Sequence, residues 1–482
     1  MSNTPAAVMK GEGAALSVKL SAITVFQIIS SFAIQWVTVV RLGLGVQSDA
    51  LFVGYTIPQV IISVVADSLI FVVVPLLASK SEQELNEDGW QLFVAIGAVF
   101  GILTVLFYFA IPAITYLIVP GLSLPAKQLA ISLSKIQIFS IIGSALYAIL
   151  TALYQVRHRF VWPMLSVLIS SICGLIILFW ALPVYGVQLA AWVQLLINTV
   201  PAILLLPILG RAHQVRLDFD LLKQVWRRMR PIMVGAIYYR TYFLGDRLLA
   251  SFLTPGSIVI LDMCQRVHNA IVRVLNQGII TPVVPRLAKL AEENKRGEFS
   301  TVIQQKTVEV LVSNTVILTL ISICGLAINR LAPSGILRHA FGSLSPGAWT
   351  TLFVVFFYMS GLLFGSSLSH TLSTAYYAGG DTVTPTKIGI VIYTIGLALK
   401  ALGFCCGGLT GIALAISFYN ILYAATLRYY LKPSQWNAME VRARSARLVE
   451  NSNLSHVAPN LTGPSVIRSE PTRLIHRATD EG

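Results

Sequence analysis

Apolar runs of roughly 20 residues recur along the chain from Val18 to Tyr430. A helix that crosses a bilayer needs about 20 mostly apolar residues, whereas a soluble core has no use for so many such runs. The pattern therefore predicts an all-α polytopic membrane protein with about twelve transmembrane helices. The expected spans are 18–40, 51–78, 92–116, 129–153, 161–182, 185–209, 231–253, 257–285, 307–329, 350–374, 387–405 and 409–430.

Composition and charge refine this prediction. Of the 482 residues, 55% are hydrophobic and 12% are charged, and the formal net charge is +14. Basic residues collect in every second connection, which is typical of cytoplasmic loops and gives no indication of nucleic-acid binding. This asymmetry predicts that both termini are cytoplasmic. The basic residues on that side include Lys80, Arg157, Arg159, Arg211, Arg216, Lys223, Arg227, Arg228, Arg230, Arg286, Lys289, Lys295, Arg296, Lys306 and Lys387.

Two short motifs repeat in the same order. Val-Val-Pro-Leu-Leu-Ala at 73–78 returns as Val-Val-Pro-Arg-Leu-Ala at 283–288, and Tyr154 and Pro163 return as Tyr376 and Pro385. Six helices repeated as six predict two pseudo-symmetric bundles with the same membrane orientation. The expected domains are an N-terminal cytoplasmic segment (1–17), the first bundle (18–209), a basic amphipathic linker or ordinary loop (210–230), the second bundle (231–430) and a disordered cytoplasmic tail (431–482).

The eighth expected span carries an unusual number of polar side chains. Their spacings of 4, 3, 4 and 3 residues place them on one face of a helix. We name this set the polar stripe: Asp262, Arg266, Asn269, Arg273 and Asn276. Charges within a membrane helix are costly and tend to face a bundle interior or a substrate path. Two arginines on the stripe favour an anionic substrate.

The seventh span adds Arg240, Asp246 and Arg247. We expect Arg240, Arg266 and Arg273 to line a central cavity and bind a phosphate or diphosphate, which suits the guanidinium fork. Asn269 and Asn276 would complete that binding site. The alternative is internal neutralisation, with Asp262 paired to Arg266 at i, i+4 and Asp246 paired to Arg240 or to an adjacent helix.

Other polar residues within the spans have plainer interpretations. Asp67 is expected to be either a cation or proton site or a structural partner. Arg247 and Lys400 are expected to extend to the membrane interface, since long basic side chains often do so. Amides also lie within the first spans, with no assigned role: Gln35, Gln59 and Gln137.

Helix-weakening residues occur at matching depths in the two bundles. They are Pro58 and Pro75 in the second span and Gly278, Pro282 and Pro285 in the eighth. Such residues allow bending, so we expect Pro58, Gly278 and Pro282 to act as hinges for alternating access. No phosphate-binding GxxxxGK[ST] loop and no metal-ligand spacing occur, which favours a transporter without ATP hydrolysis, cofactor or metal.

Three stretches of the chain carry recognisable motifs. They are Gly-Leu-Gly-Val-Gln-Ser-Asp-Ala-Leu-Phe-Val at 43–53, Leu-Ala-Ser-Phe-Leu-Thr-Pro-Gly-Ser at 249–257 and Tyr-Ala-Gly-Gly-Asp-Thr-Val-Thr-Pro at 377–385. In this order and spacing they resemble lipid II flippases (MurJ-like), a branch of the multidrug/oligosaccharidyl-lipid/polysaccharide exporter superfamily. The resemblance implies a V-shaped pair of six-helix bundles in the bacterial inner membrane. It also implies flipping of an undecaprenyl-diphosphate-linked saccharide such as lipid II, with Arg266 at a cavity arginine of the family.

The partners and the energy source of the protein are expected on the same hypothesis. Its partners would be the lipid-linked glycan, bilayer lipids and glycan-synthesis enzymes, and membrane potential or an ion gradient would drive transport. The chain departs from the family pattern where an Arg-Asp pair of the first helix is Ile34-Gln35 and a second-helix arginine falls near Ile62-Ser63. These departures leave three alternatives open: an exopolysaccharide or O-unit flippase, a cation-coupled multidrug exporter, and a non-transporting scaffold for glycan synthesis.

Overall fold

The computed structural model describes residues 5–78, 80–210, 219–293, 295–331 and 346–431. These ranges consist of helices and turns without any strand, which confirms the all-α class. Residues 211–218 of the predicted linker and the predicted tail from residue 432 lie outside them. The helices are α1 (Pro5–Leu42), α2 (Val46–Leu77), α3 (Glu82–Ile118), α4 (Leu124–Gln137), α5 (Ser140–Val156), α6 (Val161–Leu205), η1 (Leu206–Leu209), α7 (Phe219–Ala250), α8 (Ser257–Leu275), η2 (Asn276–Ile280), η3 (Thr281–Val283), α9 (Val284–Glu292), α10 (Arg296–Leu331), α12 (Pro346–Tyr358), α13 (Ser360–Ala378) and α14 (Val383–Tyr430).

Eight stretches of helix in the described residues are long and apolar enough to cross a membrane. They make the chain a multi-pass membrane protein. Helices α7 and α8 are not among the eight, because their arginines and aspartates interrupt the apolar runs. The eight are Lys19–Leu42, Val46–Leu77, Glu82–Ile118, Leu124–Val156, Val161–Leu209, Arg296–Ala327, Gly347–Ala378 and Val383–Tyr430.

The two longest helices are each a hairpin. Helix α6 breaks at Gly186, whose φ of 65° favours glycine, and the Ser170 hydroxyl donates to the Ile197 carbonyl at 3.1 Å. Residues 27 apart would lie about 40 Å apart along a straight helix, so the chain must reverse between them. Helix α14 breaks at Gly407 and Gly408 in the same way, and the Tyr423 hydroxyl donates to the Pro385 carbonyl at 3.3 Å.

The backbone repeats one turn at both copies of the Tyr–Pro motif. His158 has a φ of 58°, and Gly380, 222 residues later, has a φ of 82°. In each turn the next backbone N–H donates to the tyrosine carbonyl, from Arg159 to Tyr154 at 2.8 Å and from Asp381 to Tyr376 at 2.9 Å. The two copies of the Tyr–Pro motif therefore adopt the same local turn conformation.

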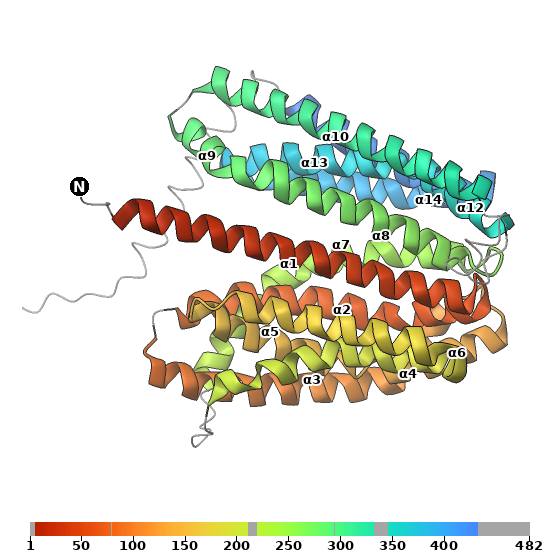
Figure 1. Cartoon of the computed structure of the whole chain (residues 1–482), viewed down its shortest axis with the longest axis horizontal. Coiled ribbons are helices and arrows are strands. Elements are labelled where there is room, and N and C mark those ends of the chain that lie inside the picture. The colour runs from red at the N-terminus through yellow and green to blue at the C-terminus, as the bar shows by residue number, and fades with distance from the viewer. Residues whose placement is uncertain (1–4, 79, 211–218, 294, 332–345, 432–482) are drawn as a thin grey trace, which may run out of the picture. The chain divides into compact units, whose positions relative to one another are not determined.

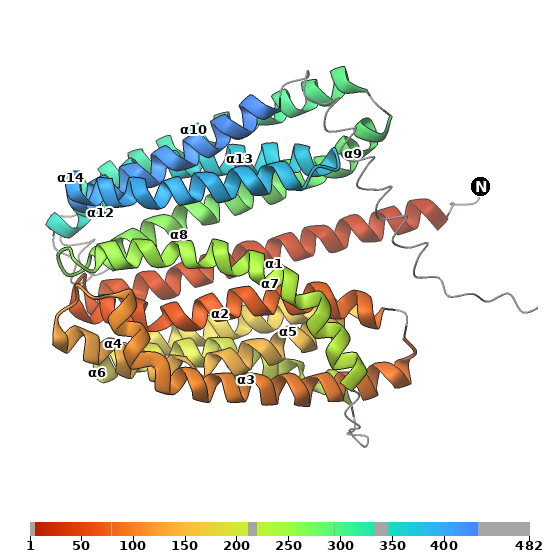
Figure 2. The same ribbon diagram turned by 180° about the vertical axis from the view of Figure 1, so that it is seen from behind.

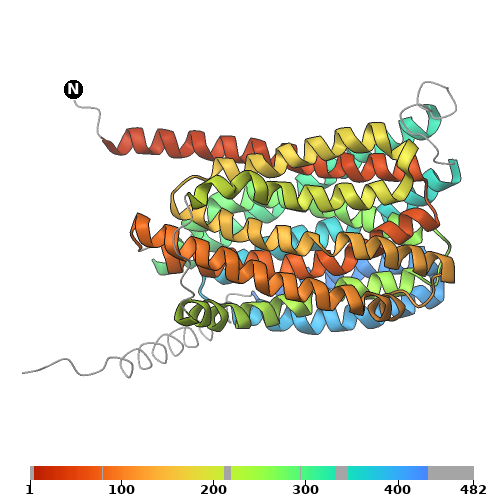
Figure 3. The ribbon, with the colours of Figure 1, turned by 90° about the horizontal axis from the view of Figure 1, so that it is seen from below.

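The helices of residues 5–430 pack as two groups. Figures 1 and 2 show α2 to α6 on one side and α8 to α14 on the other, with α1 and α7 between them. Helix α1 packs on α6, and α7 contacts α2 as well as α14. Figure 3 shows the helices running along a common direction, as an assembly of membrane-crossing helices requires.

The predicted hinge residues fall in different local structures. Gly278 lies in the π-helical turn η2 and Pro282 lies in the 3₁₀ turn η3, so the α-helical hydrogen-bond pattern is interrupted between α8 and α9. Pro58 lies inside α2, which continues past it. Such π and 3₁₀ segments are common at positions where helices bend, and the role of all three residues in motion stays a prediction.

Candidate functional site

The starts of α2 and α8 are joined by one buried carboxylate. Asp49 in the first turn of α2 accepts hydrogen bonds from the backbone N–H of Gly256 at 2.6 Å and of Val259 at 3.1 Å. The first N–H groups of a helix lack partners within the helix and attract negative charge. Asp49 therefore caps α8 from the other group of helices and fixes the position of the polar stripe relative to α2.

Two arginines share the carboxylate of Asp262. The Arg247 Nη2 lies 2.6 Å from Asp262 Oδ1, and the Arg266 Nε pairs with Asp262 Oδ2, as the i, i+4 spacing predicts. Arg247 also donates to the Thr56 hydroxyl, and Arg266 Nη2 donates to Gln59 Oε1 at 3.3 Å. This cluster connects α7 and α8 to α2.

The two arginines differ in exposure. The side chain of Arg247 is 10% exposed, and that of Arg266 is 28% exposed. The expectation that Arg247 extends to the membrane interface is therefore wrong, because the Asp262 carboxylate and Thr56 hold it in the interior. Arg266 keeps part of its guanidinium accessible and could meet a ligand.

The remaining stripe residues are more open. Asn269 and Arg273 are exposed and Asn276 is half-buried, and Arg273 forms no ion pair with any described residue. The polar stripe is therefore most accessible in its middle, at Asn269 and Arg273. The side chains of Arg240 and Asp67, both named by the sequence, lie outside the described residues.

A second ion pair lies inside the α7–α14 contact. Lys400 Nζ is 2.5 Å from Asp246 Oδ1, and the lysine side chain is fully buried. The ammonium lies 3.4 Å from the ring centre of Tyr242 and 5.4 Å from that of Tyr419, and Gln265 donates to Asp246 Oδ2 at 2.7 Å. The expectation that Lys400 reaches the membrane interface is wrong, since a carboxylate and aromatic faces replace water around it.

A cavity of about 370 Å³ lies among α1, α2, α4, α5 and α6, and Arg266 of α8 reaches it. Among the described residues that line it, Arg266 alone is charged. We name it the amide cavity because most of its polar groups are neutral amides and hydroxyls. These polar groups belong to Ser31, Gln35, Thr38, Tyr55, Gln59, Gln137, Ser144, Tyr147, Ser171, Gln194 and Asn198.

The amides of this cavity are only partly satisfied. The side-chain amides of Gln194 and Asn198 lie near the Tyr55 hydroxyl. Gln137 is 1% exposed, and both its amide nitrogen and its amide oxygen lack a partner. A buried polar group without a partner is costly and rare in folded proteins. The sequence placed Gln35, Gln59 and Gln137 within spans, but it gave no signal that they converge on one cavity.

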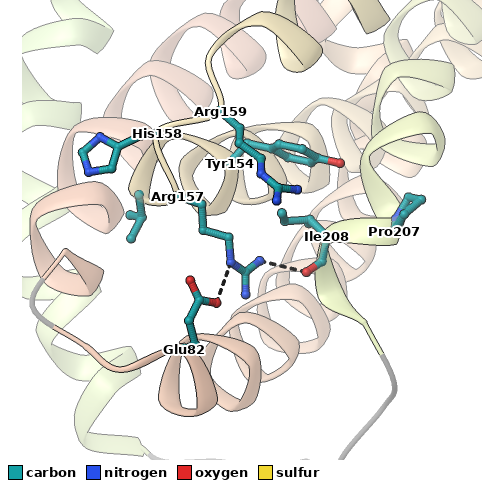
Figure 4. Close-up of a pocket in the computed structure, with 8 residues that line it drawn as sticks. Glu82, Tyr154, Arg157, His158, Arg159, Pro207 and Ile208 are labelled. Carbon is teal, nitrogen blue, oxygen red and sulfur yellow. Dashed lines mark hydrogen bonds and ion pairs between the residues drawn. The ribbon is translucent and has the colours of Figure 1, made fainter. Parts of the chain in front are cut away.

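A separate pocket of about 590 Å³ lies where α3 begins and where the α5–α6 turn meets η1, as Figure 4 shows. Arg157 donates to Glu82 at 2.9 Å, to the Ile208 carbonyl at 2.9 Å and to Asn86 at 2.7 Å. Since its guanidinium bonds to the start of α3 and to η1, Arg157 at the end of α5 holds these elements together and serves a structural role. No group of three His, Cys, Asp or Glu side chains placed to hold a metal ion occurs among the described residues.

Comparison with known proteins places this geometry in context. The sequence model of the family described as "Lipid II flippase MurJ" matches residues 39–454. A Thermotoga maritima protein described as "Probable lipid II flippase MurJ" is 26% identical over 360 residues, which cover 72% of this chain and 71% of that protein.

Two solved structures share the fold. One, described as "Lipid II flippase MurJ, inward closed conformation", has a TM-score of 0.72 at 20% identity and covers 92% of this chain and 94% of its own. The other, an inward-facing multidrug resistance MATE family transporter of the MOP superfamily, has a TM-score of 0.69 at 12% identity, with 89% and 99% covered.

Proposed function

Since this chain belongs to the lipid II flippase family, we propose that it moves an undecaprenyl-diphosphate-linked saccharide across the bacterial inner membrane by alternating access. The observation that carries the proposal is Arg266, which is paired with Asp262, partly exposed and in contact with the amide cavity. A guanidinium that is held in place yet accessible suits a diphosphate, because its planar fork matches two phosphate oxygens.

The proposed path continues along the polar stripe. Arg273 is exposed and unpaired among the described residues, two helical turns beyond Arg266, so the two arginines could contact the same anion in turn or together. Arg240, Asn269 and Asn276 would belong to the same binding surface. The prenyl chain would remain in lipid, since it gains nothing from a polar path.

The proposed topology has twelve crossings with both termini in the cytoplasm. The two hairpins α6 and α14 supply four crossings, and α7 and α8 supply two more, with Asp246 and Arg247 of α7 in ion pairs with α14 and α8. The break at η2 and η3, together with Pro58, would allow the bending that alternating access needs. Membrane potential or an ion gradient would drive the cycle, because one charge moved through 100 mV is worth about 2.3 kcal/mol.

The glycan remains a choice between lipid II and an exopolysaccharide or O-unit intermediate, and glycan-synthesis enzymes are its proposed partners. A cation-coupled drug exporter is less favoured by the charges. Asp246 and Asp262 are both already paired with basic residues of the chain, so neither offers a free carboxylate to a cationic drug. A scaffold without transport has no need for the accessible Arg266 and Arg273.

The test is transport by the Arg266→Ala variant in reconstituted vesicles containing fluorescent lipid II. Hydrogen bonds to charged groups contribute roughly 1.5–3 kcal/mol, so we expect flipping to fall roughly 10- to 100-fold. Arg159→Ala is the matched control, because it removes an exposed arginine far from the polar stripe. Undiminished flipping by Arg266→Ala would remove Arg266 from the mechanism.

A further inference from the structure

The first turns of α7 have two unlike faces. On one face, Leu221, Val225 and Met229 are buried and belong to one apolar cluster with Leu77 and Leu85. Leu77 ends α2 and Leu85 lies near the start of α3, and both helices are among the candidate membrane spans. Figure 2 shows the first part of α7 crossing the ends of these two helices, with which it is in contact. This part of α7 therefore lies at the boundary of the membrane.

The second face of these turns is exposed, and aromatic and basic side chains alternate along it. Phe219, Lys223, Trp226 and Arg230 follow one another at spacings of 4, 3 and 4, which places them on one stripe of the helix. We name this set the aromatic–basic face. All four residues are exposed, Phe219 by 75% and Trp226 by 57%. Large rings outside the protein core beside basic groups are typical of helices that lie in a membrane interface.

The charge of this segment is unbalanced. Among residues 219–230 only Asp220 is acidic. Four basic residues of the segment form no ion pair with any residue that the structure describes: Lys223, Arg227, Arg228 and Arg230. Each basic residue near an anionic membrane surface contributes roughly a fivefold factor to binding. A soluble protein could also accept rings and arginines, but the position beside two span ends brings this face to the lipid headgroups first.

We infer that the aromatic–basic face of α7 docks on anionic phospholipid headgroups at the bilayer surface. Phe219 and Trp226 lie among the headgroups, and Lys223 and Arg230 bind their phosphates. This inference is independent of the transported substrate, because it concerns the lipids around the protein. Since α7 contacts α2 in the first group of helices and α14 in the second, the docked lipids hold one end of a helix that touches both groups.

The experiment follows the environment of Trp226 in the full chain. The protein is reconstituted into vesicles of phosphatidylcholine brominated near the carbonyl end of its acyl chains, either alone or mixed with phosphatidylglycerol. Bromine quenches tryptophan fluorescence on contact, and the signal of Trp226 is the difference between each protein and its Trp226→Phe counterpart. We expect quenching of Trp226 to increase when phosphatidylglycerol is present, because this lipid is anionic and phosphatidylcholine has no net charge.

Substitutions of single charges locate the interaction on the helix. Lys223→Gln/Arg230→Gln should lower the docking equilibrium in mixed vesicles roughly 30-fold, about fivefold for each charge. Arg230→Gln alone should lower it about fivefold. Arg228→Gln is the matched control, because it removes an exposed arginine of the same helix that lies two residues away and off the aromatic–basic face. It should change the equilibrium less than twofold.

Three results would overturn the inference. Absence of quenching in both kinds of vesicle would mean that Trp226 faces water or another protein. Quenching that ignores phosphatidylglycerol would mean that the face does not select anionic lipids. An equal loss in Arg228→Gln and Arg230→Gln would mean a general attraction of the basic segment, without a defined docking face.

Discussion

Two buried polar sites, the Lys400–Asp246 ion pair and the amide cavity, differ in how their polar groups are partnered. In α7 to α14, Lys400 and Asp246 neutralise each other, and tyrosine rings and Gln265 complete their surroundings. In α1 to α6, amides and hydroxyls surround a space, and Gln137 has no partner. The charges of Lys400 and Asp246 cancel within the protein, whereas both amide atoms of Gln137 are left without a partner. The comparison teaches that a sequence repeat can keep its backbone turns while its two copies differ in their buried polar residues.

The largest expected effect comes from breaking the ion pair of Lys400 and Asp246. Lys400→Met keeps much of the side-chain volume but leaves Asp246 buried without its counter-charge. We expect the free energy of unfolding to fall by about 3–5 kcal/mol, seen as a lower midpoint in thermal unfolding of the purified protein in detergent. The double variant Lys400→Met/Asp246→Asn should recover most of the loss, since no buried charge remains. A double variant no more stable than the single one would contradict the pairing.

An intermediate effect is expected where the two groups meet. Arg247→Met removes a buried guanidinium from Thr56 and Asp262, but Asp262 retains Arg266. The loss of stability should therefore be about 1–3 kcal/mol, smaller than for Lys400→Met under the same conditions. Arg266→Met serves as the comparison, and it should cost less than Arg247→Met because Arg266 is the more exposed arginine. The reverse order would mean that exposure does not determine the strength of these pairs.

The smallest effect on stability is expected at Gln137 in the amide cavity. Gln137→Leu replaces an unpartnered buried amide by an apolar side chain of similar size, which removes a desolvation cost and breaks no hydrogen bond. The free energy of unfolding, followed through the thermal midpoint, should stay within about 0.5 kcal/mol of the original value or rise. A loss of stability as large as that of Lys400→Met would show that the Gln137 amide has hydrogen-bond partners within the protein. The contrast between Gln137 and the Lys400–Asp246 pair would then disappear.

Local patterns in the sequence predicted part of this arrangement. The i, i+4 spacing of Asp262 and Arg266 predicted their ion pair, and the apolar runs predicted an all-α membrane protein. Pairing across distant segments was beyond such patterns. Lys400 and Asp246 are more than 150 residues apart, so the buried lysine looked like one near the end of a span. Gln137 and Gln194 gave no signal either, since an amide within an apolar run is equally compatible with packing.

The forked contact at Asp262 has a consequence for the timing of transport. In the proposed function, a diphosphate bound by Arg266 would compete with Asp262 for the guanidinium, and a buried carboxylate left without a counter-ion would resist that step. Here Arg247 stays behind as a second counter-ion, held by Thr56. Because Asp262 would keep one counter-ion throughout, the proposed exchange of Arg266 between Asp262 and the diphosphate would have a low electrostatic cost in both directions.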